Sequence, residues 1–535
     1  MRLPFALLLP LLGWVPALAQ QGVFSEISGK VRNALSGDPV PQARVTLRAT
    51  TGQVVAAALS SPDGSFSLPR IDPGRYHLAA ERKGYVEARF GARSSSSAGS
   101  ILAVDVGARL SGADLSMAPA AVLSGRILDE NGEPLQNAEV YTLRRSREDG
   151  RLETILTDST STNDLGEYRL PNLSPARYWL AVRYRPDTPL VRPAASPEAR
   201  QEFYVLTYYP GVPDVNAAAP LDVTPGAQMA GLDFAPARLP GGPVSGRIVK
   251  VGDGPCSRFN VTLAPRYVSG ILNSRAAPSR ENGTFEVPDI PTGSYTLLAT
   301  CSDGIRNYSA ARTVEVGNGG LQDLEVPVYP GVEISGRFVF RGNAAPPLEG
   351  LQFHLETQEP PRRSYLGRAL PDGRFALKSV PPGLYRARAS RLAEGIYVKS
   401  ILSGGVNLAA SGVNTSGGGS ISDLEVVLAP GGTVEGAVTP DEKNPGAAGV
   451  LLVPAAQERA IAGRFMTAVT DQNGRFVFRG VAPGAYKLIA WPDLEDVAYM
   501  ESKVLAAIEK SGTSISVREG ETAGAQLPLQ PPPER

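Results

Sequence analysis

The chain has 535 residues, and its 53 basic and 53 acidic side chains give a formal net charge of zero at neutral pH. This balance provides no general attraction for nucleic acid or for an acidic surface. At roughly 100–200 residues per domain, the length predicts about three to five domains. Glycine (57 residues) and proline (47 residues) are frequent, and β-branched and aromatic residues recur in short alternating stretches. Together these features indicate an all-β protein that is rich in turns.

The first nineteen residues have the pattern of a secretory signal peptide. Arg2 supplies a positive charge, residues 3–15 are largely apolar, and Ala17-Leu18-Ala19 fits the small-residue cleavage rule. A membrane anchor is the alternative, but prolines interrupt this run and it is shorter than the roughly 20 apolar residues of a spanning helix. No later stretch approaches that length. We therefore expect cleavage after Ala19 and an exported protein, periplasmic or extracellular, that does not span the membrane.

Two strand signals recur five times along the rest of the chain. The first is an apolar-x-Gly-x-apolar strand, which occurs at Ile27–Val31, Leu123–Ile127, Val244–Ile248, Ile334–Phe338 and Val434–Val438. The second is an aromatic residue just after a turn glycine, followed ten residues later by a tyrosine. These pairs are Phe66/Tyr76, Tyr168/Tyr178, Phe285/Tyr295, Phe375/Tyr385 and Phe476/Tyr486.

The spacing within the second signal has a structural interpretation. Turn dipeptides such as Asp63-Gly64 and Asn473-Gly474 precede the aromatic strand, because glycine accepts a positive φ and Asp or Asn tolerates it. Alternation along both strands predicts that all ten aromatic rings face inward. We interpret the two strands as an antiparallel pair with one buried face. Short strands at this spacing are typical of a sandwich, so the five units should share one topology and contain little helix.

The closing strands of the repeats predict five tandem modules. The ranges are 22–118 (module 1), 119–238 (module 2), 239–330 (module 3), 331–430 (module 4) and 431–530 (module 5). Each is long enough to bury a core of its own. Module 2 is the longest because residues 186–220 form an insertion that is rich in aromatic residues. We expect the modules to follow one another as an elongated chain.

The repeat resembles the carboxypeptidase regulatory-like domain, a transthyretin-like sandwich related to the B-type repeats of Gram-positive adhesins. The matching motifs are S-G-[KR]-[VI] in the first strand, P-x-x-x-A-x-V at Pro39–Val45 and Pro134–Val140, the D/N-G-x-F turn and the P-G-x-Y-x-L return strand. The resemblance implies five immunoglobulin-like or transthyretin-like antiparallel β-sandwich modules. It implies little about function, because such modules accompany many different activities.

The only two cysteines, Cys256 and Cys301, both belong to module 3. Cys301 shares parity with the inward side chains of the return strand, and Cys256 precedes the second strand. In a small sandwich these positions can lie within the roughly 5.5 Å Cα separation that a disulfide needs. Export makes oxidation available, so we expect a bridge rather than two buried free thiols.

Residues for catalysis or metal binding are scarce. His77 and His354 are the only histidines, so one domain cannot supply two, and no nucleophile-elbow, zinc-protease or phosphate-loop motif occurs. Asp471-Gln472-Asn473-Gly474 begins like a calcium loop, but no glutamate follows at the required distance and a turn explains it. We therefore expect no enzyme, no metal and no cofactor.

Exposed aromatic residues are the candidates for ligand binding. Trp179 and Trp491 alternate with inward residues and should face outward, and Tyr204, Tyr208 and Tyr209 lie in the aromatic part of the insertion. Such rings can stack on a sugar or contact a protein. The alternative is that the tryptophans pack against neighbouring segments and that the insertion folds over its own sandwich.

These patterns favour a non-catalytic binding or scaffolding protein of the cell envelope, which presents loops to a protein or polysaccharide partner. Carbohydrate binding through the exposed Trp and Tyr rings is the first alternative. An accessory subunit of an outer-membrane receptor is the second. The sequence does not identify the ligand or the oligomeric state.

Overall fold

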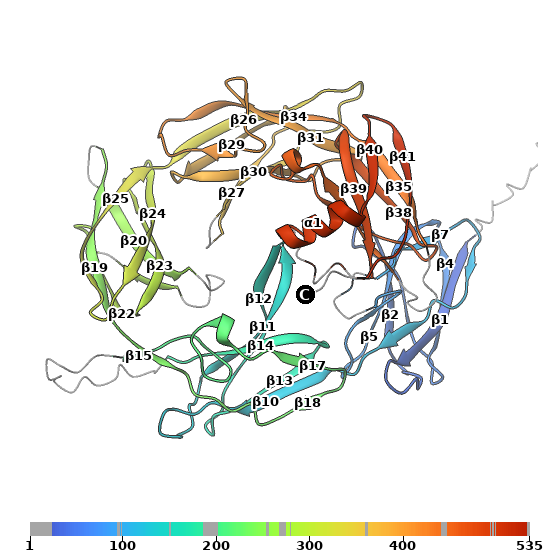
Figure 1. Cartoon of the computed structure of the whole chain (residues 1–535), viewed down its shortest axis with the longest axis horizontal. Helices are drawn as coiled ribbons and strands as arrows, with labels where there is room; N and C mark the ends of the chain where they lie inside the picture. The colour runs from blue at the N-terminus through green and yellow to red at the C-terminus, as the bar shows by residue number, and fades with distance from the viewer. Residues whose placement is uncertain are drawn as a thin grey trace, which may run out of the picture.

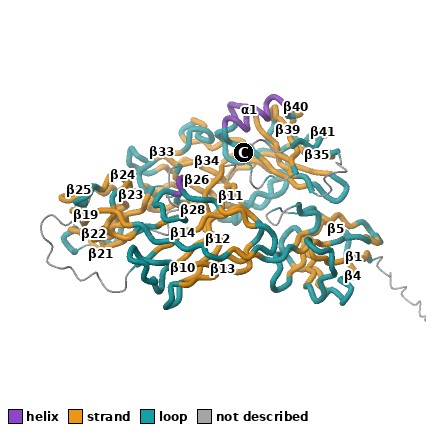
Figure 2. The backbone as a smooth tube through the Cα atoms, turned by 60° about the horizontal axis from the view of Figure 1, so that its bottom comes forward, coloured by secondary structure: helices purple, strands orange, loops and turns teal. Residues whose placement is uncertain are grey.

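The computed structural model describes residues 24–531, apart from 94–96, 98, 149–150, 186–201, 253–255, 267–273, 279, 359–361, 440–446, 493, 495–496 and 498. The predicted signal peptide, its cleavage site after Ala19 and the first part of the insertion therefore lie outside the described residues. Strands dominate the described chain, with one α-helix and two short 3-10 turns (Figure 2). This confirms the all-β prediction.

The strands of modules 1 and 2 follow the order expected from the repeat. Module 1 comprises β1 (Ser25–Asn33), β2 (Arg44–Ala49), β3 (Val54–Leu59), β4 (Ser65–Ile71), β5 (Gly74–Glu81), β6 (Ala88–Arg89), β7 (Leu102–Val104), β8 (Arg109–Leu110) and β9 (Leu115–Met117). Module 2 comprises β10 (Ala121–Arg126), β11 (Glu139–Glu148), β12 (Arg151–Ser161), β13 (Glu167–Leu173), β14 (Ala176–Arg183), β15 (Glu202–Tyr204), β16 (Thr207–Tyr208), η1 (Val215–Ala217), β17 (Leu221–Val223) and β18 (Gln228–Met229).

The remaining modules repeat this order. Module 3 comprises β19 (Arg238–Lys250), β20 (Ser257–Pro265), β21 (Arg275–Pro278), β22 (Thr284–Pro291), β23 (Gly293–Ser302), β24 (Asn307–Val316) and β25 (Leu321–Pro330). Module 4 comprises β26 (Val332–Phe340), β27 (Gln352–Thr357), β28 (Ser364–Arg368), β29 (Arg374–Val380), β30 (Leu384–Ser390), β31 (Ile396–Ser403), β32 (Val406–Asn407), β33 (Val413–Asn414) and β34 (Ile421–Pro430). Module 5 comprises β35 (Gly432–Val438), β36 (Gly449–Pro454), η2 (Ala456–Glu458), β37 (Met466–Val469), β38 (Arg475–Val481), β39 (Gly484–Trp491), α1 (Ser502–Ser511), β40 (Thr513–Val517) and β41 (Thr522–Leu527).

All five modules share the same central strand pairings, but their full topologies differ: in module 3, β24 pairs with both β23 and β25 and joins the two sheets into one. In one sheet the first strand lies between the aromatic strand and the closing strand. In the other sheet the second strand lies between the third strand of the module and the tyrosine strand. In module 5, for example, the sheets are β38-β35-β41 and β37-β36-β39-β40. Each module range contains one cluster of buried apolar side chains between its sheets. We therefore propose that the five predicted ranges are the domains of the chain.

The interpretation of the aromatic and tyrosine strands as a paired hairpin is wrong. In module 1, β4 pairs with β1, and β5 pairs with β2, so the two strands lie in opposite sheets. The chain crosses from one sheet to the other between them, which lets both rings enter the same core from opposite sides. The closing strand also runs parallel to the first strand, as β41 does beside β35, so the sandwiches are not purely antiparallel.

All ten repeat aromatics are buried, with exposed fractions between 2% and 7%, which confirms their predicted parity. The five tyrosines have a second role that the spacing did not reveal. Each phenol donates a hydrogen bond to the backbone carbonyl four residues earlier, over 2.8–3.0 Å. The bond spans the short segment in which the chain passes from one sheet to the other. This role of the hydroxyl explains why tyrosine rather than phenylalanine recurs there.

The predicted disulfide between Cys256 and Cys301 is present, with the two Cα atoms 6.0 Å apart. It joins the segment before β20 to the end of β23, and the Cys301 side chain lies in the core of module 3. The described part of the chain contains no helix long and apolar enough to cross a membrane.

Very short links connect the modules. A single residue, Gly331 or Gly431, separates the closing strand of one module from the first strand of the next. A Cβ at these glycines would lie 2.5 Å from Ser379 Cα or 2.4 Å from the Gly480 carbonyl carbon, so only glycine permits this approach. The Gly431 amide also donates a hydrogen bond to the Gly395 carbonyl at 2.8 Å. Packing rather than a flexible linker therefore fixes the orientations of modules 3, 4 and 5 relative to one another.

The modules form a closed ring instead of the expected elongated chain (Figure 1). Module 1 meets module 5 through the turn at Gln472, whose side-chain amide accepts from Ala103 N at 3.0 Å and donates to Ala103 O at 2.9 Å. The Ala447 amide donates to the Gly91 carbonyl (2.8 Å), and Arg93 Nε donates to the Ala447 carbonyl (2.7 Å). The strands β2, β11, β20, β27 and β39 lie toward the middle of the ring, and the strands β1, β10, β19 and β26 lie on its outer side (Figure 1).

Candidate functional site

The five predicted ligand-binding residues do not form one site. Trp491 faces away from the core of module 5, as its parity predicts, but it is only 2% exposed because α1 and the side chains of Leu494, Val497 and Tyr499 cover it. The expectation that Trp491 is exposed is therefore wrong. The sequence carries a signal for this cover, since residues 502–511 contain neither glycine nor proline and place Val504, Leu505 and Ile508 on one helical face.

Trp179 and Tyr208 belong to a packed layer on the face of the β11-β14 sheet that is turned away from the core of module 2. Trp179 is half-buried beside Tyr208, which is 2% exposed, and the guanidinium of Arg145 lies 5.3 Å from the indole ring. The strand β16 pairs with β14, so the described part of the insertion covers its own sandwich. Burial raises the pKa of Tyr208 to about 12. Both rings therefore fill a second small core.

Tyr204 and Tyr209 lie at two further places. Tyr204 is at the junction of modules 2 and 3, where β15 pairs with β19 and the Arg238 guanidinium lies 4.4 Å from the ring. Its hydroxyl donates to Glu130 at 3.1 Å and accepts from Arg238 at 3.0 Å. Tyr209 packs edge-on against Phe234, with the ring centroids 5.6 Å apart. These contacts join segments of the chain and leave no shared aromatic platform.

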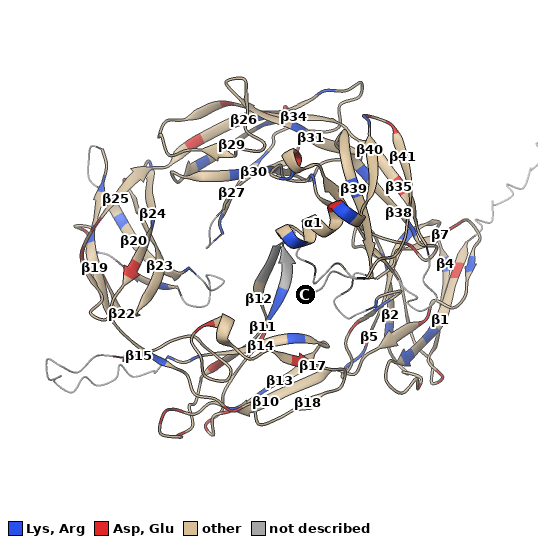
Figure 3. Ribbon diagram, viewed as in Figure 1, with Lys and Arg blue, Asp and Glu red and all other residues tan. Residues whose placement is uncertain are grey.

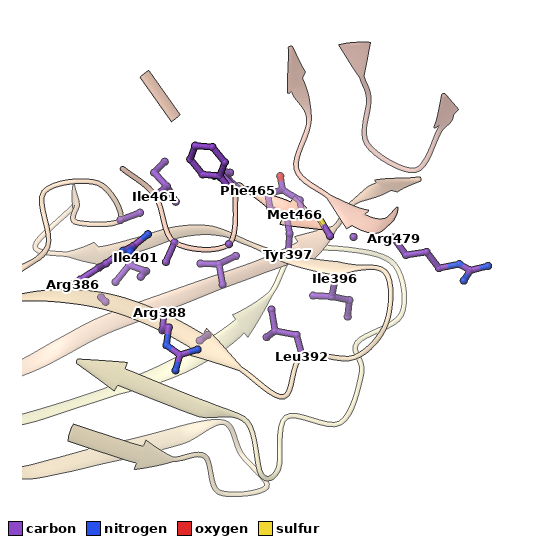
Figure 4. A pocket seen from close by; sticks show the side chains of 18 of the residues that line it. Arg386, Arg388, Leu392, Ile396, Tyr397, Ile401, Ile461, Phe465, Met466 and Arg479 are labelled. Carbon is purple, nitrogen blue, oxygen red and sulfur yellow. The ribbon is translucent and has the colours of Figure 1, made fainter. Parts of the chain in front are cut away.

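A cleft between modules 4 and 5 is the stronger candidate, and the sequence did not reveal it (Figure 4). Its volume is about 330 Å³. Module 4 contributes β30, the following loop and β31, and module 5 contributes residues 461–466, Gly480 and residues 499–500. A second cleft of about 190 Å³ adjoins it, and Arg386 and Met500 line both.

The walls of the larger cleft are mostly apolar. Leu392 and Ile396 come from module 4, and Phe465 and Met466 come from module 5. Ile461 reaches across the junction and packs against the core of module 4. Phe465 stacks on Tyr499, with the ring centroids 5.6 Å apart. The Ile461 contact joins the two modules, and the stack of Phe465 on Tyr499 orders the wall that module 5 contributes.

Four arginines line the same cleft, and three of them are neutralised by carboxylates. Arg388 bonds to Glu356 at 2.6 Å, Arg464 to Glu458 at 2.9 Å, and Arg479 to Glu394 at 2.9 Å. The Arg464 guanidinium also lies 5.3 Å from the ring of Tyr397, a tyrosine whose pKa is raised by burial. Of the described residues that line the larger cleft, none is acidic.

Arg386 is the exception. It lies opposite Glu356 in the register of β27 and β30, but Arg388 already occupies that carboxylate. Its Nε atom is buried and has no hydrogen-bond partner in the described part of the chain. The alternation Tyr385-Arg386-Ala387-Arg388 does predict that both arginines face away from the core. Only the packing of module 5 over this strand turns an exposed charge into a lining residue.

The structure brings no cluster of metal-ligating side chains together among the residues it describes.

The two histidines, His77 and His354, lie far apart in the chain, in modules 1 and 4. Burial, with a smaller contribution from Arg89, lowers the pKa of His77, and burial, with a smaller contribution from Arg388, lowers that of His354. At neutral pH these environments favour the uncharged imidazole. The cleft between modules 4 and 5, with Arg386 in its wall, remains the candidate site.

Comparison with known proteins identifies the repeats in the first part of the chain. The carboxypeptidase regulatory-like domain matches residues 26–108 and 122–202. The chain thus contains two carboxypeptidase regulatory-like domains, within modules 1 and 2. The resemblance of modules 3–5 to the same domain stays a prediction. Among curated proteins, no sequence matches this chain.

Several solved structures of bacterial proteins, pilins among them, are similar to parts of the chain. The Bacillus anthracis TIE protein is 13% identical, with 77% of this chain and 75% of that chain covered and a TM-score of 0.16. A streptococcal ancillary pilin is 11% identical, with coverages of 57% and 99% and a TM-score of 0.22. A minor pilin of Streptococcus agalactiae is 9% identical, with coverages of 40% and 97% and a TM-score of 0.23. TM-scores of this size mean that the whole chains do not superimpose.

Proposed function

Starting from a chain that contains two carboxypeptidase regulatory-like domains, we propose that the protein is an exported, non-catalytic binding and scaffolding protein. Its partner is a protein or a polysaccharide of the cell envelope, and the contact is made at the cleft between modules 4 and 5. The observation that carries this proposal is the preformed apolar cleft with an unpaired arginine, Arg386, in its wall.

Two further features support the proposal. The disulfide in module 3 is typical of proteins that function outside the reducing cytosol. The closed ring fixes every module relative to the others, so a bound partner would be held in a defined position without a conformational change. Preorganisation of this kind lowers the entropic cost of association.

The two alternatives remain distinguishable from this proposal. Stacking on sugars through Trp179, Tyr208 and Trp491 is disfavoured because these rings are buried or half-buried against their own modules. An accessory subunit of an outer-membrane receptor would copurify with an integral membrane protein. The binding experiment that follows tests the carbohydrate alternative, and copurification tests the receptor alternative.

The test compares the wild-type chain with two matched alanine-to-tryptophan variants. Ala462→Trp places an indole in the cleft, and Ala507→Trp places one on the exposed face of α1 as a control. Saturable binding is measured to a panel of purified envelope polysaccharides and to fractionated envelope proteins. We expect a ligand that the wild type and Ala507→Trp bind equally and that Ala462→Trp binds at least tenfold more weakly.

Absence of saturable binding by the wild type to every fraction would overturn the proposed function. Equal binding by all three chains would instead place the partner elsewhere on the ring. Binding confined to neutral sugars and independent of Ala462 would favour the carbohydrate alternative.

A further inference from the structure

We infer that the cleft between modules 4 and 5 recognises an apolar ligand that carries a carboxylate, with Arg386 as the group that binds the anion. The inference rests on the proposed function of this cleft as a binding site and names its ligand chemistry; a free acid as the ligand would replace the protein or polysaccharide partner proposed above. Two sources share this chemistry: a free amphipathic acid, and the carboxyl terminus of a polypeptide that ends in apolar residues.

The guanidinium of Arg386 carries a positive charge that no described carboxylate neutralises. Among the described residues Arg386 has no hydrogen-bond or ion-pair partner, and its Nε atom is buried. A buried donor without a partner is costly and uncommon in folded proteins. The guanidinium presents a planar fork of N–H donors that matches the two oxygens of a carboxylate. Protein atoms cover Nε itself, so a carboxylate in the cleft would bind the terminal nitrogens of the fork and would supply the missing counter-charge.

The other three arginines of the larger cleft already have partners. Arg388, Arg464 and Arg479 each have a carboxylate partner within 2.9 Å, so they do not compete for the same anion. No described residue that lines the larger cleft is acidic, and Glu356, which lines the smaller one, is occupied by Arg388. One positive charge thus remains uncompensated where the two clefts meet, and an anion would meet no repulsion from a free acid.

The walls of the larger cleft favour a ligand that is partly apolar. Leu392, Ile396, Ile461, Phe465 and Met466 leave little for a hydrated inorganic anion or a neutral sugar to contact. Burying them is favourable only with an apolar group on the ligand. The volume of about 330 Å³ is at the lower end of the range for small-ligand pockets. It suits one or two apolar side chains, or a medium-length acyl chain, beside the carboxylate.

The experiment uses the full chain and three probes. They are decanoate, a pentapeptide that ends in Leu-Leu with a free carboxylate, and the same peptide with a C-terminal amide. Binding is measured by calorimetry for the wild type, Arg386→Met, Arg386→Lys and the control Arg374→Met. Arg374 is an arginine of the same module that is 73% exposed and pairs only locally with Asp372. Methionine keeps the apolar stem of arginine while it removes the fork and the charge.

We expect the wild type to bind at least one acid probe and to bind the amide at least tenfold more weakly, since hydrogen bonds to a charged group are lost. Arg386→Met should lose the same factor for the acid without a change for the amide, Arg386→Lys should retain part of the affinity, and Arg374→Met should match the wild type. Decanoate alone would identify a free acid as the source, and the peptide alone a polypeptide terminus.

Folding of the variants is checked independently, because Arg386→Met removes an unsatisfied buried donor and should leave module 4 as stable as before or more so. Equal affinity for acid and amide, or undiminished acid binding by Arg386→Met, would overturn the inference. If neither acid binds while a partner sensitive to Ala462→Trp does, the inference fails and the proposed function stands. If nothing binds, both fail.

Discussion

At the scale of single residues, the repeated tyrosine shows how one side chain serves both packing and topology. Each ring fills a core, and each hydroxyl bonds to the carbonyl four residues earlier, where the chain passes between sheets. In module 5 this is the bond from Tyr486 to the Ala482 carbonyl, 2.8 Å long and buried. A phenylalanine would fill the same space but would leave that carbonyl without this partner.

Tyr486→Phe should therefore lower the local unfolding free energy of module 5 by about 1–2 kcal/mol, the usual cost of leaving a buried acceptor unsatisfied. Hydrogen exchange of the amides in β38 and β39 measures this, because a five-module chain has no single two-state unfolding free energy. Tyr329→Phe is the control, since Tyr329 is 45% exposed. If both variants exchange like the wild type, the hydroxyl contributes nothing to stability.

The same tyrosines make a prediction about pH. Burial raises the pKa of Tyr295 and of Tyr486 to about 12, whereas an unfolded tyrosine ionises near 10. As the pH rises, the tyrosines of the unfolded chain therefore lose their protons before those of the folded chain. Their contribution to the free energy of unfolding is fully present below about pH 10 and declines between about pH 10 and 12. In a tyrosinate absorbance titration, part of the signal should appear only at the upper end of that range. In denaturant all tyrosines should titrate together near 10.

At the scale of elements, parity predicts which way a side chain points but not what covers it. Trp491 and Trp179 both face away from their cores, as expected, yet α1 covers the first and the insertion packs beside the second. Likewise, the D/N-G turns and the return strands are where the sequence places them, but their pairing partners lie in opposite sheets. Alternation is a property of one strand, whereas pairing depends on the whole sandwich.

The disulfide between β20 and β23 is the element-scale feature with the clearest energetic consequence. Its cysteines are 45 positions apart, so in the chain-entropy model the cross-link stabilises module 3 by about 4 kcal/mol. The double variant Cys256→Ala/Cys301→Ala should lose protection from hydrogen exchange in module 3 while modules 1 and 5 keep theirs. Labelling the denatured, unreduced wild type with a thiol reagent provides the complementary measurement. Incorporation of label would show that the bridge does not form.

At the scale of the whole molecule, ring closure decides which surfaces are accessible. Charges of both signs are spread over all five modules, in keeping with the net charge of zero, so no general field draws modules 1 and 5 together (Figure 3). Closure depends on short-range contacts, chiefly the paired hydrogen bonds between Gln472 and the Ala103 backbone. The one-residue links at Gly331 and Gly431 bring these distant segments within reach.

Gln472→Ala should weaken closure, because it removes both of these hydrogen bonds and leaves the Ala103 amide to water. Small-angle scattering should show a larger maximum dimension for the variant than for the wild type, together with faster amide exchange at residues 101–103. Gln526→Ala is a suitable control, since Gln526 contacts only Thr439 of its own module. A wild-type scattering profile of five modules end to end would contradict the ring itself.

The sequence by itself determined the features that depend on local periodicity and composition. Five repeats, all-β modules, ten buried aromatic rings and the pairing of Cys256 with Cys301 follow from alternation, turn chemistry and spacing, because these act within one strand or one module. The tertiary structure alone decided the rest. Ring closure, the burial of Trp491 and the cleft around Arg386 arise where segments far apart in sequence pack together. No periodicity within a strand encodes such contacts, since they depend on the summed orientations of successive modules.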